Sequence, residues 1–119
     1  MANIYTNSKV DLTSTAETVV YTSPAAGTST TATTSIIKSI LVSEDSGNAD
    51  SITLTLTDAS SNVFSLFKTK TISSNTTTEL LTQPLVMEEK EILKVQAGEA
   101  NELHVIASIL QIQPREVTT

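Results

Sequence analysis

Hydrophobic and polar residues alternate along much of the chain with the two-residue period of β-strands. The clearest case is residues 51–57, where Ile52, Leu54 and Leu56 alternate with threonines. Residues 63–68 follow after a short polar turn, so these two segments are expected to form a hairpin. No segment gathers its hydrophobic residues into the 3.6-residue repeat of an amphipathic helix.

Turn-forming residues divide the rest of the chain into further short strands. The expected strands cover residues 4–12, 18–22, 35–44, 70–73, 76–81, 85–87, 92–96 and 102–113. About eight strands with turns at intervals of roughly 8–12 residues are typical of a β-sandwich or barrel. We therefore predict an all-β protein formed by a single antiparallel β-sandwich.

The length of 119 residues is that of one domain. We place the sandwich at residues 1–114, with residues 1–12 as an extended N-terminal arm, and a polar tail at residues 115–119. Residues 28–35 are small and polar, so this run is expected to form a loop or to lie flat on another surface.

The amino-acid composition and the net charge argue against nucleic-acid and membrane partners. Thr and Ser make up about 30% of the chain, which favours strands with threonine-covered faces. The net charge is −6 and the seven basic residues are scattered, so a nucleic-acid partner is not expected. The chain has no cysteine, no apolar segment of membrane-spanning length and no signal-peptide pattern at Met1. We therefore expect a cytoplasmically made protein with no membrane partner.

No group of residues matches a catalytic or cofactor-binding motif. His104 is the one histidine, and no nucleophile or orienting carboxylate accompanies it locally, so a structural role is favoured. A threefold cluster of His104 in a homotrimer is a second interpretation. The acidic residues Glu44, Asp45, Asn48 and Asp50 are interpreted as a solvated turn, with a hard-cation site as the alternative. We predict no enzyme activity, no metal and no cofactor.

Several expected strands carry hydrophobic residues on both faces. An exposed antiparallel sheet has one polar face, so the surplus points to an interface with sister copies or another protein. Coverage of both faces by the chain itself is the alternative. The candidate interface residues are Ile37, Leu41, Phe67, Ile106, Leu110 and Ile112.

Three stretches carry a resemblance to a known group of proteins. Residues 37–58 (IKSILVSEDSGNADSITLTLTD), the opening residues 1–5 (MANIY) and residues 103–110 (LHVIASIL) resemble small structural proteins of tailed bacteriophages, especially marine ones. The likeness covers most of the chain and contains no catalytic or binding motif.

This resemblance implies a β-sandwich or jelly-roll virion component made in the host cytoplasm. The role that it favours is a capsid decoration, or cement, protein, which binds the major capsid protein of the assembled shell as a homotrimer and stabilises it. A tail, neck or baseplate protein, including a fibre adaptor, is the first alternative. A host- or glycan-binding module is the second, and the low aromatic content of 3% disfavours it.

Overall fold

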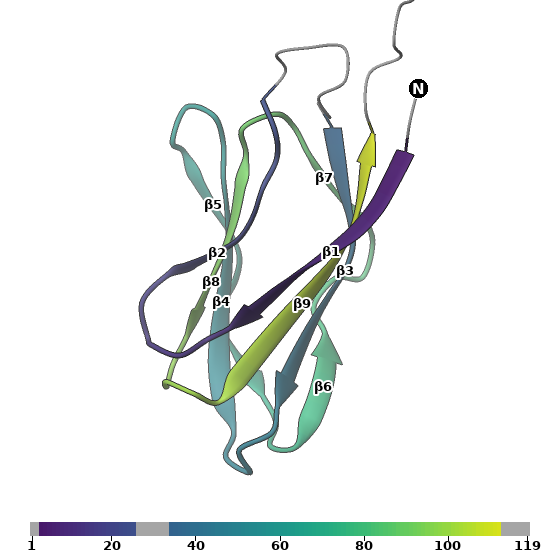
Figure 1. Ribbon diagram of the computed structural model, residues 1–119. Coiled ribbons are helices and arrows are strands. Elements are labelled where there is room, and N and C mark those ends of the chain that lie inside the picture. Colours follow the sequence, from purple (N-terminus) through teal and green to yellow (C-terminus); the bar gives the residue numbers. More distant parts are fainter. Residues whose placement is uncertain (1–2, 26–33, 113–119) are drawn as a thin grey trace, which may run out of the picture.

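The computed structural model describes residues 3–25 and 34–112, and these residues form nine β-strands and no helix (Figure 1). The expected polar tail at residues 115–119 and most of the small polar run at residues 28–35 lie outside the described residues. The strands are β1 (Asn3–Asp11), β2 (Thr18–Thr22), β3 (Thr34–Glu44), β4 (Asp50–Thr57), β5 (Val63–Ile72), β6 (Thr76–Glu79), β7 (Leu85–Met87), β8 (Ile92–Ala97) and β9 (Leu103–Ile112).

The strands form two antiparallel sheets packed face to face, which confirms the predicted sandwich. Sheet A has the order β1-β9-β3-β6, with β7 also paired to β3, and sheet B has the order β2-β8-β4-β5. The chain is folded as one long hairpin, in which β1 pairs with β9, β2 with β8, and β4 with β5. The hairpin then wraps so that β9 meets β3 and β8 meets β4. This order is that of a jelly roll.

The core lies between the sheets and consists mainly of side chains that the strands direct inward, together with Leu12 and Leu80, which directly follow β1 and β6. Ile52 and Leu54 of the most regular alternating segment are fully buried, while the intervening Thr53 is half-buried. Among residues 3–25 and 34–112, the buried hydrophobic residues are Leu12, Val20, Ile37, Ile40, Val42, Ile52, Leu54, Ile72, Leu80, Met87, Leu93, Val95, Ala97, Leu103, Val105, Ala107 and Ile109. Burying each large aliphatic side chain contributes about 1.5–3 kcal/mol.

Strand β3 contains a bulge that changes which residues face the core. The pairing with β9 shifts between Ile37 and Ser39, so Lys38 is the extra residue. Strict alternation places Ile37 and Leu41 on one face, but the bulge turns Ile37 inward and leaves Leu41 outward. The Glu79 side chain supports the bulge, because its carboxylate accepts hydrogen bonds from the Ser39 hydroxyl and, at 2.7 Å, from the Ile40 N–H.

Strand β5 is one irregular edge strand, whereas the sequence suggested two separate strands. Its register against β4 shifts on both sides of Leu54, and Thr69 has a φ of 50°. The shifts place Phe67 opposite Leu54 and Phe64 opposite Leu56. The two leucines point inward. Phe67 packs against the core, whereas Phe64 stays 55% exposed.

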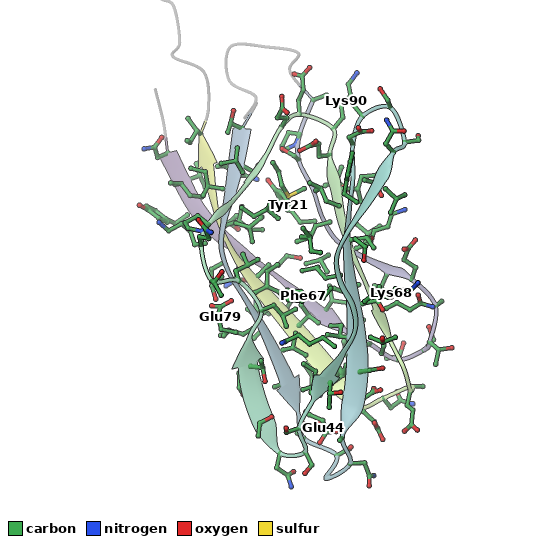
Figure 2. The ribbon with its side chains drawn as sticks, turned by 180° about the vertical axis from the view of Figure 1, so that it is seen from behind. Tyr21, Glu44, Phe67, Lys68, Glu79 and Lys90 are labelled. Carbon is green, nitrogen blue, oxygen red and sulfur yellow. The ribbon has the colours of Figure 1, made fainter. Side chains whose placement is uncertain are left out.

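A small polar cluster joins the two sheets. The Tyr21 hydroxyl of sheet B lies 2.7 Å from the Ser35 hydroxyl and accepts a hydrogen bond from the Gln111 amide at 2.8 Å, both in sheet A. Ser35 also lies 3.1 Å from the Ser23 hydroxyl. Figure 2 shows Tyr21 and Phe67 between the two sheets. Each of these hydroxyls has a hydrogen-bond partner, so the cluster joins the two sheets through satisfied polar contacts.

Candidate interaction surface

The outer face of sheet A, turned away from sheet B, carries hydrophobic side chains in a row across four strands. The register places Tyr5 opposite Leu110, Leu110 opposite Ile36, and Ile36 opposite Val86. Side chains directly opposed on one face of a sheet are in contact distance. Tyr5 is 77% exposed and Val86 is 56% exposed, so the row is open to solvent. We call these four residues the apolar row.

A second hydrophobic pair lies on the same face. Ile106 and Leu41 are opposed in β9 and β3, and they are 41% and 37% exposed. Lys9 is paired with Ile106 from β1, and Glu79 is paired with Leu41 from β6. The pair is therefore bordered by a cation on one side and an anion on the other, which is typical of the polar rim of an interface.

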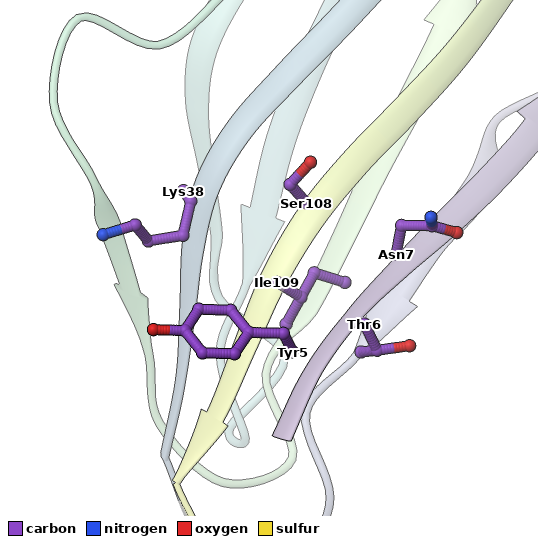
Figure 3. A pocket seen from close by; sticks show the side chains of 6 residues that line it. All are labelled: Tyr5, Thr6, Asn7, Lys38, Ser108 and Ile109. Atoms are coloured by element: carbon purple, nitrogen blue, oxygen red, sulfur yellow. The ribbon is translucent and has the colours of Figure 1, made fainter. Parts of the chain in front are cut away.

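A hollow of 430 Å³ separates the apolar row from this pair. It is lined by residues of β1, β3 and β9, namely Tyr5, Thr6, Asn7, Lys38, Ser108 and Ile109 (Figure 3). Figure 3 shows the side chains of Tyr5 and Lys38 on the same side of β9, with Asn7 on β1 on the other side. The extra residue of the β3 bulge, Lys38, thus contributes a cation to a surface that is otherwise uncharged at this point.

The structure distributes the six candidate interface residues over three environments. Leu41, Ile106, Leu110 and Ile112 lie on the outer face of sheet A, where the inward neighbours Ala107 and Ile109 alternate with them. Ile37 is 0% exposed and belongs to the core, so the prediction that it faces outward is wrong. Phe67 is half-buried and packs on the core near sheet B.

Three residues of this surface were not among the candidates. Tyr5 was expected in an extended N-terminal arm, and β1 pairs with β9 from Asn3 to Asp11 and becomes part of sheet A. Ile36 is half-buried and lies on the outer face, opposite to the buried Ile37. Val86 lies in the three-residue strand β7, and so short a segment carries almost no alternation signal.

His104 lies on the same outer face between two carboxylates. Its Nδ1 is 3.1 Å from Asp11 Oδ1, and its Nε2 is 3.3 Å from Asp45 Oδ1. A doubly protonated imidazolium donates to both, whereas the neutral ring donates to one. All three side chains are substantially exposed, so His104 forms a surface polar contact that ties the end of β1 to the β3–β4 turn.

The acidic turn after β3 is organised by hydrogen bonds from backbone amides. Glu44 is 1% exposed, and its carboxylate accepts from the N–H groups of Ser46 and Gly47 at 3.1 Å and of Asn75 at 3.2 Å. Burial alone raises the pKa of Glu44, but these bonds and one from the Ser46 hydroxyl outweigh it and hold the pKa below its usual value. Glu44 thus joins the β3–β4 and β5–β6 turns (Figure 2).

Glu102 is a second acidic residue at this end of the sandwich, and its pKa is raised where that of Glu44 is lowered. Glu102 is 9% exposed, and its Oε2 has no hydrogen-bond partner. Burial raises the pKa of Glu102, and so do its hydrogen bond to Glu99 and the charges of Glu99, Asp50 and Glu44. The described residues contain no group of three acidic or histidine side chains placed to hold a metal ion. They also contain no helix long and apolar enough to cross a membrane.

No protein-family model matches this sequence, and no curated protein sequence matches it. A solved structure with a similar fold comes from Bacillus endospore appendages, described as a novel family of disulfide-linked pili. It aligns over 95% of this chain and 89% of its own, with a TM-score of 0.54 and 10% identity. At this identity the likeness shows the fold alone.

Two further structures are chains of infectious bursal disease virus, from the Gt and Gx strains. Each aligns over 95% of this chain, with TM-scores of 0.41 and 0.33 and identities of 9% and 8%. This chain spans 31% and 38% of those two virus chains.

Proposed function

We propose that this chain is a structural protein without catalytic activity that attaches to other protein surfaces through the outer face of sheet A. The observation that carries the proposal is the apolar row from Tyr5 to Val86, open to solvent across four neighbouring strands. A polar outer face is the ordinary arrangement for an antiparallel sheet in water, and contiguous exposed hydrophobic side chains mark sites of protein contact.

Within this class, the proposed role is a decoration protein on the capsid of a tailed bacteriophage, bound as a homo-oligomer to the major capsid protein. The sequence resemblance in residues 37–58 and 103–110 supports it. Jelly rolls recur in viral capsid domains, which is an argument by analogy of fold. The similar fold of a pilus subunit adds that this scaffold serves in an assembling structural protein elsewhere.

The geometry suggests how such a protein would stabilise a shell. The outer face of sheet A is built on paired strands, so its backbone is already ordered when it meets a partner. A ligand that binds the assembled shell and not its separated subunits shifts the equilibrium toward the assembled form. Because a shell repeats the same site many times, an oligomer that spans neighbouring sites gains avidity from individually weak contacts.

The experiment is to locate and count the protein on virus particles. Antibodies raised against the purified chain are used for immunogold electron microscopy of purified virus particles. Quantitative gels of the same particles give the number of copies per particle. Gold over the heads with hundreds of copies per particle supports decoration. Gold at the tail or neck with a few dozen copies supports the alternative structural role. Absence from purified particles would overturn a virion role altogether.

A further inference from the structure

Strand β1 gives sheet A an open edge. β1 pairs with β9 on one side, and no strand in residues 3–25 and 34–112 pairs with its other side. The Leu12 N–H donates to the Leu103 carbonyl at 3.0 Å, continuing this register. Hydrogen-bonded and non-bonded pairs alternate along an antiparallel ladder, so the even-numbered residues of β1 bond to β9. The odd-numbered residues from Asn3 to Lys9 direct their backbone N–H and C=O groups to the open edge.

The other edges of the two sheets are irregular or short, and β1 is neither. The register of β2 shifts after Val19, β5 shifts twice, and β6 and β7 have four and three residues. Such features discourage pairing with another chain. β1 runs for nine residues in unbroken register, without proline and with a single lysine. The Ser8 hydroxyl bonds to the Val20 carbonyl of β2, which holds the middle of β1 in place.

We propose that the open edge of β1 pairs with the β1 edge of a second copy, antiparallel about a two-fold axis at Asn7. The two copies of sheet A then form one continuous sheet. This axis sets the strand opposite its second copy over its full length, from Asn3 to Asp11, and the backbone groups of Tyr5, Asn7 and Lys9 form its centre. The Asp11 carbonyl at one end also accepts a bond from the Thr13 N–H at 3.0 Å. An axis at Lys9 would oppose two lysines, which is repulsive. An axis at Tyr5 would limit the pairing of described residues to Asn3–Asn7.

Both faces of β1 are self-complementary in this register. On the outer face, the Tyr5 ring lies opposite Lys9 of the second copy, an arrangement that favours a cation–π contact on each side of the axis. On the inner face, Ile4 lies opposite Val10 of the second copy. Ile4 is 40% exposed although it points to the inner side, so the second copy covers a hydrophobic side chain that its own sandwich leaves open.

The pairing also extends the surface described above. Tyr5 is the last residue of the apolar row of one copy, and it lies opposite Lys9 of the second copy. Within the second copy, Lys9 is paired with Ile106, which is paired with Leu41. The hydrophobic residues of two outer faces thereby become one surface. The inference concerns the strand edge and does not depend on which partner that surface meets.

Single cysteines test the register, because the chain has none of its own. In Asn7→Cys the two engineered residues face each other, with Cα atoms about 5.5 Å apart in a hydrogen-bonded pair, inside the roughly 4.4–6.8 Å range of disulfides. Mild oxidation is expected to give a reducible covalent dimer. Tyr5→Cys and Lys9→Cys alone are expected to stay monomeric on a non-reducing gel, since each lies about 13 Å from its own copy at roughly 3.3 Å per residue. Mixing those two variants is expected to give the heterodimer.

Proline at the same position tests the hydrogen bonds. The Asn7 N–H points to the open edge, so Asn7→Pro removes no bond to β9 and is tolerated as an edge-strand proline. We expect unchanged β-type circular dichroism and a dimer dissociation constant raised at least roughly tenfold in sedimentation, with one backbone bond lost from each copy. Asn7→Ser keeps the N–H and is expected to stay dimeric.

The inference fails if the unmodified chain sediments as a monomer or trimer, or if Tyr5→Cys alone cross-links as readily as Asn7→Cys. A trimer is the assembly that the phage resemblance implies, whereas a two-fold edge contact builds even-numbered assemblies. A dimer that is missing from virus particles would overturn the proposed function and leave this contact standing. Protein that is bound to particles but does not cross-link at residue 7 would support the proposed function and overturn the β1 edge contact.

Discussion

Glu44 and Asn75 lie 31 residues apart in the chain, and the carboxylate of Glu44 accepts a hydrogen bond from the Asn75 N–H at 3.2 Å. The same carboxylate serves the turn that follows β3, so one buried side chain fixes two loops. Polar groups buried in this way are costly to leave without partners.

Glu44→Gln is therefore expected to lower the melting temperature at pH 7. A neutral amide directs hydrogen atoms at some of the backbone N–H donors that the carboxylate accepts. The pKa of Glu44 is lower in the folded chain than its ordinary value of 4.5, so its stabilisation is present above that pH and is lost as the pH falls through the folded value.

The measurement is thermal unfolding of wild type and Glu44→Gln from pH 7 down to pH 3. The difference in melting temperature should shrink with acidification. Glu88→Gln, at an exposed turn position, is the matched control and should change little. A difference that stays constant over the whole range would contradict the assigned role of the ionised carboxylate.

Glu102→Gln is expected to raise the stability of the fold at neutral and higher pH, whereas Glu44→Gln lowers it. The pKa of Glu102 is raised by burial, by its hydrogen bond to Glu99 and by neighbouring negative charges. A carboxyl with a raised folded pKa stabilises the fold at low pH, and that contribution is lost as the pH rises through the folded value. The variant should therefore be more stable than wild type at pH 8 and equal to it near pH 4, as measured by urea unfolding at each pH.

Tyr21→Phe is expected to cost about 0.5–1.5 kcal/mol of stability, the usual net contribution of a hydrogen bond. The variant removes the hydroxyl that joins Ser35 and Gln111 across the two sheets. The Ser35 hydroxyl retains Ser23 as a partner, which limits the loss. Chemical denaturation measures the change, and Tyr5→Phe, at an exposed position, provides the control.

Leu54→Ala is expected to cost about 2–5 kcal/mol, because it opens a cavity in the core. Leu54 is 0% exposed between the sheets. Leu66→Ala makes the same chemical change at a position that is 39% exposed, and a much smaller loss is expected. Equal losses for both variants in urea unfolding would contradict the assignment of Leu54 to the core.

Leu110→Asp is expected to reduce binding to virus particles while β-type circular dichroism is retained, because Leu110 is in the middle of the apolar row. Val63→Asp places the same charge on an exposed hydrophobic residue of sheet B and is expected to bind normally. Phe67→Asp is expected to destabilise the fold, since Phe67 packs on the core. Co-sedimentation with particles lacking the protein separates these cases, and equal binding by Leu110→Asp and wild type would exclude the apolar row.

Strand positions were predictable because turn residues and two-residue alternation are local signals. Residues 18–22 were expected as a strand and form β2, and residues 85–87 form β7. The faces of strands were less predictable where a bulge intervened. Nothing in the residues Ile37, Lys38 and Ser39 announces the extra residue between them, since the bulge is supported by Glu79, 40 positions further on from Ser39.

The candidate surface was predictable in part for the same reason. Leu41, Ile106 and Leu110 follow from alternation, and they do lie on the outer face of sheet A. Tyr5 and Val86 join them only because β1 and β7 are brought to either side of β9 and β3. Such an assembly from both ends of the chain depends on the wrapping of the jelly roll, which no local pattern specifies.

The pairing of Asn3 with Ile112 determines how the molecule would respond to mechanical load. Tension applied through these two positions pulls β1 and β9 apart at one end of their ladder, so their hydrogen bonds would open one pair at a time. Force applied along the strands must instead shear many bonds together, which requires far more work. From this pairing we expect the molecule to resist load directed along the strands better than load applied at the two neighbouring strand ends.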